Sequence, residues 1–98
     1  MIVLVEGLDF QAFDSVEEMI VDCEEIDVAR SMYRAFEDTG NEILLAVRIE
    51  NGRRAICAAR SPTNRKEWLV SMLERYFEVA GEQCDSKIVE FYRLLRVK

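Results

Sequence analysis

The side chains that could exchange protons or attack a substrate in this chain are carboxylates and thiols, because its 98 residues include no histidine. Glu17 and Glu18, like Glu24 and Glu25, are sequence neighbours, and neighbouring positions of a helix do not face each other. Glu17 or Glu18 could share a helix face with Asp22, but a solvated helix surface explains these carboxylates better than a catalytic pair. We therefore expect no catalytic residues and no enzymatic activity.

The three cysteines, Cys23, Cys57 and Cys84, are widely spaced, and no two of them form a C-x-x-C pair. Without histidine, the chain lacks the residues of a Cys/His zinc site. Its four glycines stand apart from one another and form no phosphate-binding or dinucleotide-binding loop. We expect no metal, no cofactor, and three free thiols buried in a reducing cytosol.

The first residues, Met1 to Val5, form an apolar run without a basic flank, which does not make a signal peptide. No stretch approaches the ~20 apolar residues that a membrane-spanning helix needs. We therefore expect a cytoplasmic protein that does not contact a membrane.

Acidic residues are concentrated at the start of the chain. Residues 1–29 contain nine acids and no base, although the net charge of the whole chain is only −6. Such a block creates a negative field that attracts cationic partners and repels nucleic acid. The block either keeps the protein soluble or binds a basic protein, and composition leaves both alternatives open. The candidate partner-binding residues are Glu17, Glu18, Asp22, Glu24, Glu25 and Asp27.

Basic residues occur later in the chain, where they are interleaved with acids. With a pI of about 4.7, the protein lacks the basic footprint of a nucleic-acid-binding domain, so we expect no nucleic-acid partner. These basic residues are Arg48, Arg53, Arg54, Arg60, Arg65 and Lys66.

Trp68 lies just off an apolar helical stripe and is either a residue at the edge of the core or an interface anchor.

The first 40 residues predict a strand and a helix, and then become ambiguous. Residues 2–6 are β-branched and apolar and predict a strand, residues 7–14 predict a connection, and Asp14 or Ser15 can cap a helix. A helix at about 15–25 followed by a strand at about 28–37 is one interpretation. A single helix reaching Phe36 fits the apolar spacing nearly as well.

The clearest signal is Asn51-Gly52 between two apolar runs, which predicts a two-residue β-hairpin turn. This loop length sets the register, so that Glu50 faces Arg53 and Val47 faces Ile56. We expect Val47 and Ile56 to be buried. The opposite face consists mostly of small side chains that let another layer approach: Leu44, Ala46, Ala55, Cys57 and Ala59.

Two helices are predicted to end the chain. Ser61-Pro62 is a cap followed by proline at the first helical position, and Asn64 with Glu67 offers an alternative start. Gly81 ends the first helix, and Asp85 or Ser86 caps the second. The apolar faces consist of Leu69, Met72, Leu73, Tyr76, Phe77 and Ala80, and then of Ile88, Phe91, Tyr92 and Leu95; Arg93, Arg96 and Lys98 end the last helix.

These elements predict a single α+β domain over residues 1–98. An antiparallel sheet packs against two to three helices in the order β-α-β-β-β-α-α, or β-α-β-β-α-α if the first helix is long.

Part of the chain resembles small immunity proteins encoded beside bacterial polymorphic and contact-dependent toxins. The resemblance covers about residues 13–45 and rests on the runs 13–18, 25–28 and 33–36 and on Gly40. It implies a small, acidic, non-catalytic protein that binds and neutralises a cognate toxin domain, and it implies no role for any individual residue. We therefore expect a protein-binding domain with a basic toxin domain as its partner. The alternative is a structural or regulatory homo-oligomeric module, and a homodimer is compatible with both.

Overall fold

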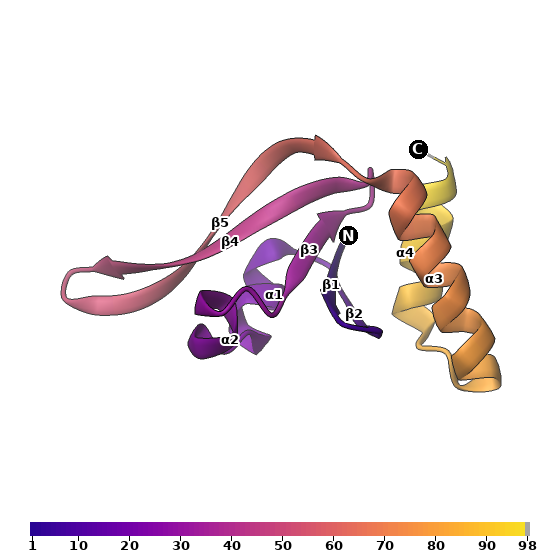
Figure 1. Ribbon diagram of the computed structural model, residues 1–98, viewed down its shortest axis with the longest axis horizontal. Helices are drawn as coiled ribbons and strands as arrows, with labels where there is room; N and C mark the ends of the chain where they lie inside the picture. The colour runs from indigo at the N-terminus through magenta and orange to yellow at the C-terminus, as the bar shows by residue number, and fades with distance from the viewer. Residues whose placement is uncertain (98) are drawn as a thin grey trace.

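A computed structural model describes residues 1–97 as a five-stranded antiparallel sheet packed with four α-helices (Figure 1). The predicted α+β class is confirmed, with one strand and one short helix more than predicted. The strand order across the sheet is β2-β1-β3-β4-β5. The elements are β1 (Ile2–Glu6), β2 (Asp9–Phe13), α1 (Val16–Asp22), α2 (Glu25–Ala29), β3 (Arg34–Glu37), β4 (Asn41–Glu50), β5 (Arg53–Asn64), α3 (Lys66–Ala80), the 3-10 turn η1 (Gly81–Gln83) and α4 (Ser86–Val97).

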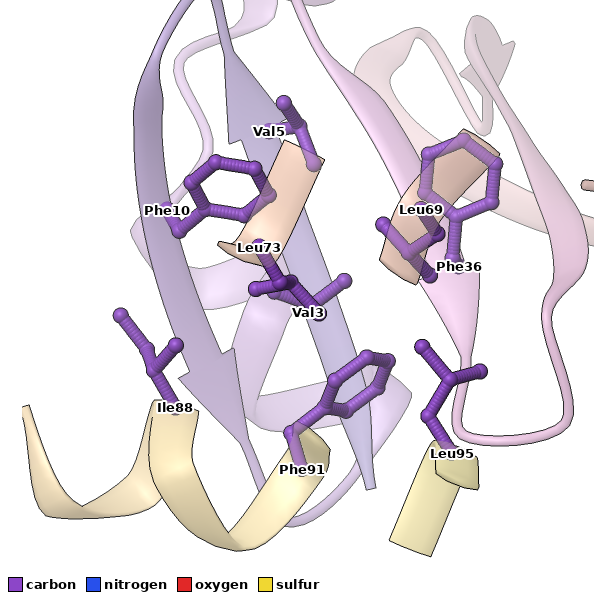
Figure 2. Close-up of a cluster of buried hydrophobic side chains, with 9 residues drawn as sticks. All are labelled: Val3, Val5, Phe10, Phe36, Leu69, Leu73, Ile88, Phe91 and Leu95. Atoms are coloured by element: carbon purple, nitrogen blue, oxygen red, sulfur yellow. The ribbon is translucent and has the colours of Figure 1, made fainter. Parts of the chain in front are cut away.

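The continuous apolar run of β1 is explained by burial on both faces of the sheet. Successive strand residues point to opposite faces, so Val3 and Val5 face α3 and α4, whereas Ile2 and Leu4 face α1. Figure 2 shows the larger cluster, which joins three strands to both C-terminal helices. Its buried residues are Val3, Val5, Phe10, Phe36, Leu69, Leu73, Ile88, Phe91 and Leu95.

Strand β2 corrects the prediction of a connection over residues 7–14. It follows a tight turn at Gly7-Leu8 and pairs with β1 from Glu6↔Asp9 to Ile2↔Phe13. Phe10 packs on the α3–α4 side and Phe13 on the α1 side. Because the two phenylalanines pack on opposite faces of the sheet, the segment lacks the simple alternation of apolar and polar residues that predicts a strand.

Residues 15–37 were predicted either as a helix followed by a strand or as one long helix, and the structure follows neither interpretation completely. The first helix is confirmed as α1, capped by Ser15, whose Oγ accepts a hydrogen bond from the backbone N–H of Glu18 at 3.2 Å. The chain then becomes extended at Cys23, which excludes the long helix. A second helix, α2, holds Val28 in a buried position, so β3 begins at Arg34 and not at residue 28.

The register of the β4–β5 hairpin is confirmed, with Glu50 opposite Arg53 and Val47 opposite Ile56. Its expected burial is wrong, because Val47 and Ile56 are only half-buried. The hairpin extends well beyond the other elements (Figure 1), and the molecule measures 45 Å in this long dimension against 27 and 21 Å in the others. Helices α1 and α2 are too short to cover the whole hairpin.

The start of α3 also differs from the first prediction. Ser61 and Pro62 lie inside β5, which is an edge strand and so tolerates proline. The alternative start is closer to the structure, because Oδ1 of Asn64 accepts a hydrogen bond from the backbone N–H of Lys66 at 3.0 Å. Helix α3 ends at Gly81 as predicted. Lys98, expected at the end of α4, lies outside the described residues.

Candidate protein-binding surface

The six candidate acidic residues lie on α1, on α2 and on the two residues between them. The inward sides of these helices are fixed, because Met19 and Val28 are buried and Ile20 packs against the core. The carboxylates therefore point outward, all exposed except that of Asp27, which is half-buried. We call this surface the acidic layer; it consists of Glu17, Glu18, Asp22, Glu24, Glu25 and Asp27.

Two apolar side chains are exposed within the acidic layer. Val21 is 83% exposed on α1, and Ile26 is 54% exposed on α2. Apolar residues surrounded by charged ones are the usual composition of a protein interface, with a water-excluding centre and a polar rim. Neither residue was a sequence candidate, although Val21 falls outside the stripe formed by Val16, Met19, Ile20 and Cys23, and this could have indicated its exposure.

Tyr33 links the acidic layer to the sheet. Its hydroxyl donates a hydrogen bond to Oδ2 of Asp27 at 3.2 Å, across the loop between α2 and β3. Burial raises the pKa of the Tyr33 phenol, and the negative charges of Asp27 and Glu6 contribute in the same direction. The hydrogen bond to Asp27 connects α2 to the segment just before β3.

Beside Tyr33 lies an open hollow of about 340 Å³. Its lining includes the carboxylates of Glu6, Asp9 and Asp22 together with Leu4 and Phe10. Glu6 and Asp9 form the last residue pair of β1 and β2 before the turn, so the negative surface continues from the acidic layer to this end of the sheet. Among residues 1–97, no group of three or more Asp, Glu or Cys side chains is arranged to hold a metal ion.

Trp68, the possible anchor, lies on α3 and so on the other side of the sheet from the acidic layer. Its half-buried indole packs against the larger core cluster, with its ring centroid 5.6 Å from that of Phe36. The guanidinium of Arg34 stacks on the indole, 4.7 Å from its centroid, and Nε of Arg34 donates to Glu42 at 3.3 Å. These contacts favour the core-edge interpretation of Trp68.

The three cysteines are free, but they are half-buried and not buried as expected. Burial raises the pKa of the Cys23 thiol, and the carboxylate of Asp22 adds to this effect, so the reactive thiolate is disfavoured. Cys84 donates to the backbone carbonyl of Gly81 at 2.9 Å, and Cys57 lies on the exposed hairpin.

Comparisons with models of protein families, with curated proteins and with solved structures give no match. Within residues 1–97, no helix is long and apolar enough to cross a membrane. The resemblance over residues 13–45 therefore stays a hypothesis.

Proposed function

We propose that this protein is a non-catalytic binding domain that receives a basic protein on its acidic layer. The observation that supports the proposal is the grouping of six carboxylates around exposed Val21 and Ile26, in a region without a single basic residue before Arg30. A toxin domain neutralised by an immunity protein in the cytoplasm is the class of partner that the resemblance suggests.

The physical basis of the proposal is electrostatic attraction followed by apolar contact. A field from several unpaired carboxylates raises the association rate of a cationic partner, and salt weakens that field. Val21 and Ile26 then supply apolar surface that loses its water in the complex. The short helices are held to the sheet by Met19 and Val28, so the surface needs little rearrangement before binding.

The test reverses the charge of the acidic layer and compares it with an equal reversal elsewhere. Glu17, Glu18, Glu24 and Glu25 are replaced by Lys; each reversal adds two charges, so the net charge moves from −6 to +2. The control replaces the exposed acids of the α3–η1–α4 region, Glu67, Glu78, Glu82 and Glu90, and reaches the same net charge. Exposed charges contribute little to folding, so circular dichroism should show both variants folded.

Wild type and both variants are then used to capture proteins from the native host, and association with the captured partner is measured at several salt concentrations. We expect the acidic-layer variant to associate about tenfold more slowly at low salt, and the control to lose much less. If both variants associate equally slowly, the effect comes from the net charge of the protein and not from the acidic layer. A wild-type rate in the acidic-layer variant would exclude this surface from binding.

A further inference from the structure

The outer part of the β4–β5 hairpin is a two-stranded ribbon without a third strand. Strand β3 pairs with β4 only at Ala35↔Ile43 and Phe36↔Glu42, and β5 is the edge of the sheet. Within residues 1–97, positions 44–50 therefore have β5 as their only strand partner. We call residues 46–57, from the Ala46↔Cys57 pair to the turn, the arm. The turn end of this hairpin projects beyond α1 and α2 in Figure 1. Such a ribbon is only marginally stable in water by itself.

One face of the arm is apolar and uncovered. Residues that alternate along a strand share a face, so Val47 and Ile49 continue the face on which Ile43 and Leu45 pack against the α1 side. Ile56 lies opposite Val47 on this face. Helices α1 and α2 cover the base of the face, but Ile49 is 77% exposed and Val47 and Ile56 are half-buried. The helical layer thus ends before the apolar face does.

The arm is also basic. Arg48, Arg53 and Arg54 are exposed. Arg54 lies opposite Ile49 on the uncovered face, whereas Arg48 and Arg53 lie on the other face, where Glu50 is opposite Arg53. In the part of the chain that the structure describes, none of these three arginines has an ion-pair partner, and neither does any carboxylate of the acidic layer. One molecule therefore presents an apolar face that carries the cation of Arg54 and, separately, exposed apolar residues surrounded by carboxylates.

We propose that the arm of one copy packs across the acidic layer of a second copy, and that two-fold symmetry makes the contact reciprocal. The α1–α2 layer of the second copy then continues the helical cover of the arm, so Val47, Ile49 and Ile56 meet Val21 and Ile26. Arg54 lies among the carboxylates of the partner. A contact that occurs twice about a two-fold axis closes the assembly as a dimer.

This inference rests on the proposed function because it assigns a second copy to the same acidic layer. A basic protein partner and the arm would compete for that layer. Self-association would then keep the acidic layer covered until the partner displaces the arm.

The test measures the dimer dissociation constant by sedimentation equilibrium at low and high salt. We expect a dimer in the wild-type protein, weakened by salt. Arg54→Glu should raise the dissociation constant about tenfold or more, and Glu24→Arg with Glu25→Arg should do the same. The control, Arg93→Glu, reverses an exposed arginine on α4 and should leave the constant unchanged. All of these side chains are exposed, so circular dichroism should show that every variant is folded.

A mixing experiment makes the test specific. Arg54→Glu is mixed with the Glu24→Arg, Glu25→Arg variant in equal amounts. In the mixed dimer, the altered arm of the first variant meets the altered acidic layer of the second, so the charges of this contact are exchanged but still opposite. The other contact joins the unaltered arm to the unaltered acidic layer, as in the wild type. We expect the mixture to regain the dimer that each variant alone has lost. A wild-type protein that sediments as a monomer at every concentration, or a mixture that stays monomeric, would overturn the proposal.

The capture experiment distinguishes this proposal from the proposed function. Arg54→Glu leaves the acidic layer intact, so it should lose the dimer and still bind a basic partner. A monomeric wild type that captures a basic partner through the acidic layer would reject the arm contact and keep the proposed function. A wild-type dimer whose acidic layer captures no basic protein would reject the proposed function and keep the arm contact.

Discussion

The α-amino group of Met1 lies 2.7 Å from Oδ2 of Asp38, and both side chains are largely enclosed, with 8% and 11% of their surface exposed. The backbone N–H of Asp38 donates in turn to the carbonyl of Met1 at 3.1 Å. These contacts join the start of β1 to the turn after β3, next to the β1–β3 pairing at Ile2↔Glu37. A charge in such a position is costly unless its partner is present.

Asp38→Asn should therefore destabilise the protein. The substitution removes the negative charge and leaves the part-buried contact of the Met1 ammonium with a weaker acceptor, at a cost of about 2 kcal/mol in the free energy of unfolding. Asp14→Asn is the matched control, because Asp14 forms an exposed ion pair with Lys87 at 3.3 Å, and it should cost less than about 0.5 kcal/mol. Urea denaturation measures both changes, and equal stabilities would contradict the role assigned to Asp38.

Gly40→Ala should be more damaging than Gly52→Ala. Both glycines have positive φ, 91° and 74°, and at Gly52 a Cβ would meet nothing within 4 Å. Gly52→Ala should thus cost only the conformational strain, about 1 kcal/mol. A Cβ at Gly40 would lie 2.8 Å from Cα of Lys66, so the start of α3 would have to move. Equal denaturation midpoints for the two variants would contradict this close packing.

Ile43→Asp and Val47→Asp should differ sharply although both residues lie on one face of β4. Ile43 is 4% exposed and packs in the core beneath α1, so its replacement by a charge should unfold the protein, at a cost above about 4 kcal/mol. Val47 is half-buried on the arm, and its replacement should leave a folded protein that is weaker as a dimer. Circular dichroism and thermal melting separate these results; unfolding of the Val47 variant would show that the arm is buried in the monomer.

Alkaline pH should destabilise the protein partly through Tyr33 and Tyr92. Burial and nearby carboxylates raise the pKa of Tyr33, and the hydrogen bond from Tyr92 to Glu74 at 2.9 Å raises the pKa of Tyr92, both from an ordinary value of 10.0. The unfolded chain therefore loses these protons first. Their contribution to stability is complete below pH 10 and disappears as the pH rises through the higher pKa values of the folded state.

The double variant Tyr33→Phe, Tyr92→Phe isolates this contribution. We expect it to lose less stability than the wild type between about pH 9 and about pH 11, measured as the change in urea denaturation midpoint. Identical changes in the two proteins would show that neither phenol contributes.

Several features of the fold could be predicted from short stretches of sequence because their causes are local. Asn51-Gly52 determines the hairpin register, since a two-residue loop leaves one way to pair the strands. Ser15 places the start of α1 for a similar reason, by accepting the hydrogen bond of Glu18. The acidic block was also visible in the sequence, and its division into α1 and α2 still leaves its carboxylates on the outward side.

Other features depend on which segments meet in three dimensions. Strand β2 forms because it pairs with β1 and because Phe10 and Phe13 pack into the core clusters on opposite faces of the sheet. The periodicity of the local sequence shows neither of these contacts. The stacking of Trp68 with Arg34 likewise joins residues on different elements. The sequence by itself determined the elements with local causes and the charge of the acidic layer. Only the tertiary structure decided that Ile49 is exposed and that Val47 and Ile56 are no more than half-buried, because burial depends on the length of α1 and α2 relative to the hairpin that they pack against.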